Sequence, residues 1–245
     1  MKDRLQQLQS AFEGYGLGIS DEQSFSFLRY AELLEEWSSR FNLTAVLDFS
    51  EMLHRHFVDS VFPFAAGLVP SEGSLLDLGS GAGFPGIPLK IMFPSLDITL
   101  MDSLDKRIGF LNHVIKELSL KDIRAIHGRA EDLARTDLRE SFSFVTARAV
   151  APLSVLLEYG IPFVKSGGIM AAYKTREAAF RETEESSRAA ELLGLSPGAV
   201  SVFPYELRTR EDESPRDLAM VLVNKYGPVP DKYPRRAGIP AKRPL

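Results

Sequence analysis

The chain has 245 residues, of which 44% are hydrophobic and 25% charged, and its formal net charge at pH 7 is −4. It contains no cysteine, which excludes disulfides, thiolate metal sites and a cysteine nucleophile. The first ten residues, MKDRLQQLQS, have no apolar core, and no apolar run approaches the ~18 residues of a membrane span. We therefore expect a cytoplasmic protein without a membrane segment and, because the histidines lack zinc-like spacing, without a metal site.

Residues 1–70 are expected to form helices, because their apolar residues recur at helical spacing. After Gly73, short apolar strands alternate with helices as in successive β-α-β units. The strands are expected at 74–80, 96–102, 123–128, 142–148, 167–174, 199–208 and 217–225, and the helices at 84–93, 104–118, 152–164 and about 176–193.

This order predicts an α/β fold in which a Rossmann-like, mostly parallel sheet of seven strands carries helices on both faces. We expect a helical cap at 1–70 that packs on the core, a ligand-binding domain at 71–226 and a basic, proline-containing tail at 227–245. Ligands of such sheets bind beyond the carboxyl ends of the strands, so the candidate functional residues are those that follow each strand.

A glycine-rich loop, DLGSGAG (77–83), follows the first strand. Glycine tolerates backbone angles that other residues resist and lets a ligand approach the main chain. A dinucleotide site would have the pattern GxGxxG, but the sixth position counted from Gly79 is Phe84. The acid-x-G-x-G-x-G form led by Asp77 instead resembles the first motif of class I methyltransferases, whose cofactor S-adenosylmethionine (SAM) has no phosphate. Phe84 could pack on that cofactor or belong to the core.

Two acidic residues follow the next two strands. Asp102 lies 23 residues beyond Gly79, where a carboxylate can accept hydrogen bonds from both ribose hydroxyls, and it could also cap the helix at 104–118. In the segment GRAED (128–132), backbone groups could contact the adenine edge. Glu131 could accept a hydrogen bond from the adenine amine or cap the following helix.

The fourth strand ends at Arg148, where this class keeps its reaction-centre group. The lack of cysteine removes the thiolate route to C5 of pyrimidines, and no Asn/Asp-Pro-Pro-Tyr/Phe element for exocyclic amines follows the strand. An arginine stays protonated and is a poor base, whereas guanine N7 has a free lone pair and needs none. We therefore hypothesise a guanine N7 acceptor, with a structural salt bridge as the alternative role of Arg148.

Charge is unevenly distributed along the chain. Residues 225–245 contain six basic residues and one acidic residue, a net charge of +5, so the remainder carries −9. This asymmetry favours an anionic partner for the tail, and a solubilising terminus is the alternative.

Six ordered motifs, spread over nearly the whole chain, resemble those of the bacterial ribosomal small-subunit RNA methyltransferase G family, also called glucose-inhibited division protein B. They are FNLTAV (41–46), RHFVDS (55–60), LLDLGSGAGFPGIPLKI (75–91), LMDSLDKRIGFL (100–111), GRAED (128–132) and ARAVAPL (147–153). The tail KYPRRAGIPAKRPL resembles that of the longer members. The resemblance implies a class I methyltransferase that transfers a methyl group from SAM to N7 of one guanine in 16S rRNA.

The resemblance also implies site residues. Arg148 would lie near both the cofactor and the target base, which makes it the candidate catalytic residue. Cofactor contacts would fall on Gly79, Phe84, Ala130, Glu131 and Arg148, to which strand position adds Asp102.

RNA contacts are expected at Lys174, which matches a family position, and at Arg235 and Arg236 of the tail. Lys174 could instead be an ordinary surface lysine. We expect a monomer that acts on 16S rRNA or a small-subunit ribonucleoprotein, the alternative being a SAM-dependent methyltransferase of small molecules.

Polar residues in the first two motifs have two open roles. They could shape the substrate face, or they could fix the N-terminal helices to the core, which is the commoner role of such residues. The residues are Asn42, Thr44, Arg55, His56 and Asp59.

Overall fold

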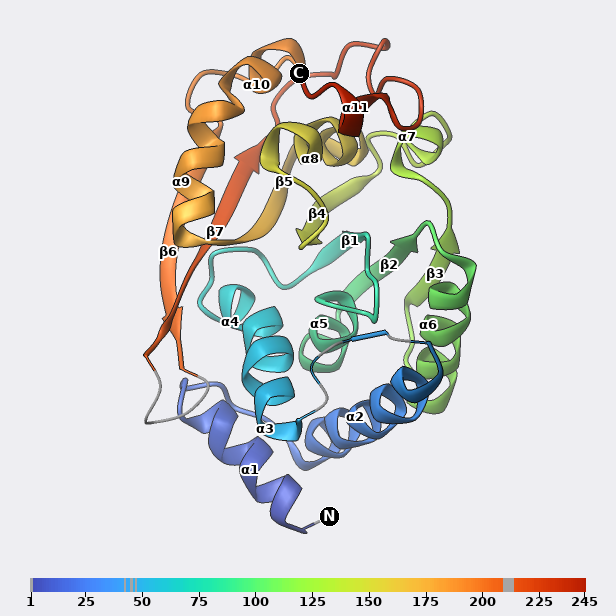
Figure 1. The fold of residues 1–245 in the computed structure, drawn as a ribbon, viewed down its shortest axis with the longest axis vertical. Coiled ribbons are helices and arrows are strands. Elements are labelled where there is room, and N and C mark those ends of the chain that lie inside the picture. The colour runs from blue at the N-terminus through green and yellow to red at the C-terminus, as the bar shows by residue number, and fades with distance from the viewer. Residues whose placement is uncertain (1, 42, 45, 47, 209–213) are drawn as a thin grey trace.

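The fold is taken from a computed structural model that describes residues 2–41, 43–44, 46, 48–208 and 214–245. Its centre is a seven-stranded sheet in the order β3-β2-β1-β4-β5-β7-β6 (Figure 1). β1 to β5 run parallel, and the last two strands are antiparallel to their neighbours. The strands are β1 (Gly73–Leu78), β2 (Leu96–Asp102), β3 (Ile123–His127), β4 (Phe142–Arg148), β5 (Val164–Thr175), β6 (Val200–Leu207) and β7 (Arg216–Asn224).

Helices cover both faces of this sheet. One face carries α1 (Lys2–Glu13), α2 (Asp21–Phe41), α3 (Phe49–Met52), the π-helix η1 (Leu53–Val58), α4 (Asp59–Ala65), α5 (Gly86–Met92) and α6 (Asp105–Glu117). The other carries α7 (Ala130–Leu133), α8 (Leu153–Gly160), the 3-10 helix η2 (Ile161–Phe163), α9 (Arg176–Glu185), α10 (Ser187–Leu192) and, within the C-terminal tail, α11 (Ile239–Lys242).

The alternation of side chains along each strand builds two hydrophobic clusters. In β1, Leu75 points into the cluster that contains the N-terminal helices, and Leu76 points into the cluster that contains α8 and the tail. In β7, Met220 belongs to the cluster of the N-terminal helices, and the next residue, Val221, belongs to the cluster of α8 and the tail. The helices before Gly73 therefore share their core with one face of the sheet.

The strand order reverses between β1 and β4. From β1 the chain proceeds through β2 to β3 at one edge of the sheet and then returns to β4, which pairs with the other side of β1. The connections that leave β1 and β4 therefore diverge and leave a crevice beyond their carboxyl ends, which is where ligands bind in open α/β sheets.

The predicted α/β sheet is confirmed, with differences in detail. The expected helix at 152–164 ends in the 3-10 helix η2, and β5 begins at Val164 instead of residue 167. The expected helix at 176–193 is divided at Ser186 into α9 and α10. The N-terminal helical region includes the π-helix η1, which a regular 3.6-residue pattern does not predict.

The buried hydroxyl of Tyr30 links α2 to the glycine-rich loop, because it donates a hydrogen bond to the carbonyl oxygen of Ala82 at 2.5 Å. Tyr30→Phe should lower the free energy of unfolding by about 2 kcal/mol, since that carbonyl would lose its partner in the interior. Urea denaturation measures this change. Tyr226→Phe, at a side chain that is 67% exposed, is the control, and equal stability of the two variants would contradict the assignment.

Candidate active site

The glycine-rich loop after β1 has backbone angles that require glycine. Gly79 has φ +71° and Gly83 has φ +101°, both in the left-handed region. A Cβ atom at Gly79 would lie 2.8 Å from the side chain of Val150, and one at Gly83 would lie 2.7 Å from the hydroxyl of Tyr30. The loop can therefore approach its surroundings closely only because these side chains are absent.

The carboxylate of Asp77 holds the far end of this loop from within the core. Its Oδ2 accepts a hydrogen bond from the backbone N–H of Gly86 at 3.0 Å, and Oδ1 lies 3.4 Å from the hydroxyl of Thr146, which donates to it. Burial raises the pKa of Asp77 to about 6, although these hydrogen bonds favour the charged form. Asp77 therefore stabilises the loop from the buried side, away from solvent.

Asp102 ends β2 and holds the near end of the loop. Its Oδ2 accepts from the N–H of Gly81 at 2.9 Å and from the guanidinium of Arg107 at 3.0 Å. Its Oδ1 accepts from the N–H of Leu104 at 2.9 Å, at the start of α6. Asp102 thus stabilises the turn into α6 without being its N-cap residue, which is Leu104, and it is also one of the residues that line a cavity.

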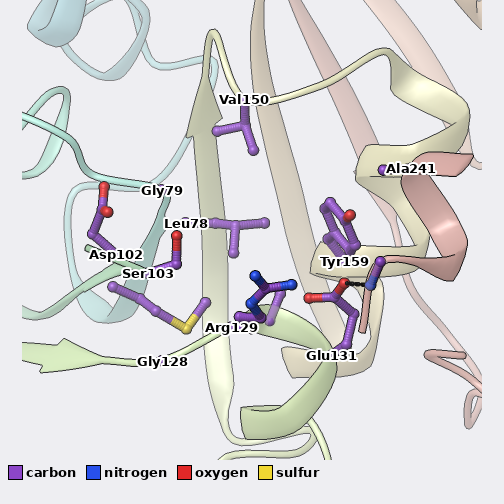
Figure 2. Close-up of a pocket in the computed structure, with 13 residues that line it drawn as sticks. Leu78, Gly79, Asp102, Ser103, Gly128, Arg129, Glu131, Val150, Tyr159 and Ala241 are labelled. Carbon is purple, nitrogen blue, oxygen red and sulfur yellow. Dashed lines mark hydrogen bonds between the residues drawn. The ribbon is translucent and has the colours of Figure 1, made fainter. Parts of the chain in front are cut away.

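That cavity, the first cavity, has a volume of about 330 Å³ and lies beyond the carboxyl ends of β1, β2 and β3 (Figure 2). Its size is within the range of small-molecule sites, about 300–1,000 Å³. Its walls combine apolar side chains with two carboxylates and exposed backbone. The lining residues are Leu78, Gly79, Met101, Asp102, Ser103, Gly128, Arg129, Ala130, Glu131, Val150, Tyr159, Gly238 and Ala241.

A second cavity, of about 510 Å³, lies on the other side of the loop that follows β4. Ala149 lines this second cavity and the next residue, Val150, lines the first. Ala149 has φ +56°, a conformation that is unfavourable for a residue with a side chain and that often marks functional sites. The second cavity is lined by Val46, Arg55, His56, Asp59, Arg148, Ala149, Tyr173, Lys174, Thr175, Ala178, Tyr205, Arg216 and Leu218.

Arg148 is fixed by acceptors from η1 and α4. Its guanidinium donates to the carbonyl oxygen of Arg55 at 3.2 Å, to Asp59 at 3.3 Å and to Nδ1 of His56 at 3.1 Å. It also lies over the ring of Phe84, 4.9 Å from the ring centroid. Only 14% of the Arg148 side chain is exposed, so its position is determined by these contacts.

His56 is a neutral partner in this arrangement. Burial, together with the charge of Arg148, lowers its pKa to about 3. Because Nδ1 accepts from Arg148, the proton of the neutral ring lies on Nε2, which is 3.2 Å from the hydroxyl of Thr44 and donates to it. The carbonyl oxygen of Arg55 also lies 3.0 Å from Nδ1, and in this tautomer it accepts from Arg148 and not from the ring.

Four of the six predicted cofactor residues line the first cavity: Gly79, Asp102, Ala130 and Glu131. The other two do not. Arg148 lines the second cavity, and Phe84 is a buried ring stacked on His56 with centroids 4.4 Å apart. The structure thus favours the core interpretation of Phe84.

The predicted RNA contacts have unequal surroundings. Lys174 donates to the carbonyl of Ala151 at 2.7 Å and pairs with Glu182 at 2.9 Å, so it holds the loop after β4. Arg235 forms an ion pair at 2.6 Å with Glu158, whose side chain is fully buried. Arg236 is exposed.

The two motifs before β1 contribute to the second cavity as well as to the core. Arg55, His56 and Asp59 line this cavity, and the last two also hold Arg148. Asn42 lies outside the described residues.

Several lining residues were not singled out by the sequence. Val150 in the first cavity belongs to the motif ARAVAPL but had no predicted role. Tyr159 in the first cavity, and Tyr205 and Arg216 in the second, come from segments without a motif. The guanidinium of Arg216 lies 3.6 Å from the carboxylate of Asp59, a residue of the RHFVDS motif. This proximity becomes apparent only in the folded structure.

Residues 23–209 match the family described as rRNA small subunit methyltransferase G. The chain is 43% identical over 238 residues to the ribosomal RNA small subunit methyltransferase G of Lactococcus lactis, covering 96% of this chain and 97% of that protein. It is 46% identical over 232 residues to the protein of the same name from Streptococcus pneumoniae, covering 94% of each.

The chain belongs to this family. The relationship extends over the N-terminal helices, the sheet and the tail, because the matched relatives cover at least 94% of the chain. A solved structure from Corynebacterium glutamicum has a TM-score of 0.53 at 14% identity, over 90% of this chain and 96% of that one, and it supports the fold alone.

The described residues contain neither a candidate membrane span nor a candidate metal site. Among them, no helix has the length and apolar character needed to cross a membrane. Within the same residues, no group of three or more His, Cys, Asp or Glu side chains is arranged to hold a metal ion.

The raised pKa of Asp77 predicts a pH-dependent stability. The pKa of Asp77 in the folded protein lies above that of an aspartate in the unfolded chain. The stability that the protonated carboxyl contributes is therefore present below about pH 4 and is lost as the pH rises through about 6. Asp77→Asn has no titrating group at this position, so its stability should not fall over this pH range for this reason. Between pH 4 and 7 its unfolding free energy should gain about 2 kcal/mol relative to that of the native protein.

Urea denaturation of both proteins at several pH values tests this prediction. Asp97→Asn, at an exposed position of β2, controls for the loss of a carboxylate. Parallel stability curves for Asp77→Asn and the native protein would show that Asp77 does not titrate in this range.

Proposed function

We propose that the chain transfers a methyl group from SAM to N7 of a guanine in 16S rRNA. The observation that carries this proposal is the family match over residues 23–209, and the two adjoining cavities are consistent with it. In this proposal the first cavity holds the methyl donor and the second receives the target nucleotide.

The first cavity offers suitable partners for SAM. Oδ1 of Asp102 accepts one hydrogen bond within the described protein, so it has a lone pair for a ribose hydroxyl. Oε1 of Glu131 accepts from the N–H of Gly238 at 2.8 Å, and the hydroxyl of Tyr159 also interacts with this carboxylate. The remaining lone pairs of the carboxylate can accept from the adenine amine. Leu78, Met101 and Val150 provide apolar surface for the rings.

The second cavity has the charge expected of a nucleotide site. Arg55, Arg148, Lys174 and Arg216 surround it, with Asp59 as the carboxylate among its lining residues. Arg148 uses three of its donors on Arg55, Asp59 and His56, which leaves N–H groups for a phosphate or the O6 atom of guanine. A cavity of this kind suits an anionic substrate.

Methyl transfer to N7 requires no proton acceptor from the protein. Bound SAM supplies an electrophilic methyl group; the N7 lone pair forms the new bond, and the sulfur keeps the electrons of the broken one. The residues of the chain therefore act by alignment, which contributes most of the rate in such displacements. Arg148 is a positioning and binding group, consistent with its permanent charge.

The RNA-binding surface is proposed to extend from Lys174 to the exposed tail residue Arg236, with Arg235 contributing through its orientation of the tail. Phosphate contacts of this kind make affinity strongly salt-dependent. We further propose that the protein acts as a monomer in the cytoplasm, on 16S rRNA or a small-subunit ribonucleoprotein.

Small subunits from cells that lack this protein, incubated with the purified chain and radiolabelled SAM, test the proposed function. Label should enter 16S rRNA, and mass spectrometry of its nucleosides should detect 7-methylguanosine. Label in a small metabolite and none in rRNA would favour a small-molecule methyltransferase and overturn the proposal.

Asp102→Asn should weaken SAM binding about tenfold to a hundredfold, because it replaces a charged acceptor of the ribose hydroxyls by a neutral amide. Isothermal titration calorimetry measures the affinity, and circular dichroism checks the fold. Asp105→Asn is the matched control, since its side chain is 90% exposed and lies three residues further along the chain. Unchanged affinity of Asp102→Asn would remove the ribose contact from the account.

A further inference from the structure

The C-terminal tail packs against the second hydrophobic cluster and does not extend into solvent. In Figure 1 it lies beside α7 and α8. Val229 and Tyr233 are buried in that cluster at 4% and 5% exposure. The guanidinium of Arg139 donates to the carbonyl oxygens of both residues at 2.9 Å.

Two of the basic residues in this region are used to dock it. The Nζ atom of Lys225 donates to Glu140 and to the carbonyl of Val164, both at 2.5 Å. Arg235 binds Glu158 of α8 through its side chain, and its backbone N–H donates to the same carboxylate at 2.7 Å. These bases therefore neutralise carboxylates of the protein itself.

Beyond Arg235 the tail reaches the first cavity. Gly238 has φ +79°, and its N–H donates to Oε1 of Glu131 at 2.8 Å. Gly238 and Ala241 both line the cavity. Figure 2 shows α11, which carries Ala241, on the side of the cavity opposite the glycine-rich loop.

We infer that residues 237–245 form a wall of the SAM site and orient Glu131 for the adenine, so that cofactor affinity depends on the end of the chain. Glu131 is only 5% exposed, and its hydrogen bond to Gly238 fixes the orientation of its carboxylate. Without this segment, the cavity would lose one side and the carboxylate would be open to water.

The inference rests on the proposed function for the identity of the cofactor. It assigns to the tail a second role, distinct from RNA binding. The exposed bases Arg236, Lys242 and Arg243 remain available to RNA, whereas Gly238 and Ala241 face the cofactor side. The two roles can therefore be separated by substitutions in adjacent residues.

A chain that ends at Arg236 tests the wall directly, since it keeps the buried residues Val229 and Tyr233 and the pair of Arg235 with Glu158. Calorimetric titration with SAM should give an affinity about tenfold weaker than that of the full chain, as expected for the loss of a charge-assisted hydrogen bond and its apolar cover. Affinity within twofold of the full chain would overturn the inference.

Ala241→Leu provides a second test that does not depend on how a shortened chain folds. Ala241 is exposed apart from its cavity contact, so the larger side chain should fill the cavity and weaken SAM binding with little change in thermal stability. Lys242→Leu, the next residue on α11, is the matched control and should bind SAM as the native chain does.

The outcomes separate this inference from the proposed function. If the full chain binds SAM and the two tail variants bind it equally well, the wall is wrong and the proposed function stands. If the full chain does not bind SAM at millimolar concentration, the proposed function fails first. If Lys242→Leu weakens binding as much as Ala241→Leu, α11 acts through its charge or its docking, and the assignment of Ala241 to the wall is wrong.

Discussion

The geometry of both cavities depends on the reversal of strand order between β1 and β4. At this point two loops must diverge while their strands remain paired, and the loop after β1 can do so only with glycine at its tightest positions. Two carboxylates then hold it in place, Asp77 from the core through Gly86 and Asp102 from β2 through Gly81. The loop is thus pre-formed, and a ligand would not have to order it on binding.

The loop after β4 separates the two cavities. Arg148 and Val150 lie on either side of Ala149, whose left-handed backbone directs them to different spaces. The π-helix before α4 supplies the acceptors that hold Arg148, namely the carbonyl of Arg55 and the ring of His56. Because His56 stays neutral, this support does not change with pH in the physiological range.

The sequence was sufficient to predict the sheet, because apolar strands and glycine turns are local signals. It also placed Gly79, Asp102 and Glu131 at or shortly after the carboxyl ends of strands, and all three line the first cavity. It did not predict the π-helix, which has no distinct residue pattern, or the placement of Phe84 beneath His56. The basic tail was interpreted from its charge and from its resemblance to the tail of longer family members. Its docking depends on the buried partners Glu140 and Glu158, and such long-range pairing cannot be derived from spacing.

The separation of a donor cavity from an acceptor cavity is the central claim, and hydrogen–deuterium exchange measured with each ligand in turn tests it most directly. S-adenosylhomocysteine alone should slow exchange at 79–83 and 128–131, which line the first cavity, and leave 55–59 unchanged. Addition of small subunits should then slow exchange at 55–59 and 173–176. Protection of the same segments by both ligands, or protection of 55–59 by the cofactor product alone, would contradict the two-cavity account.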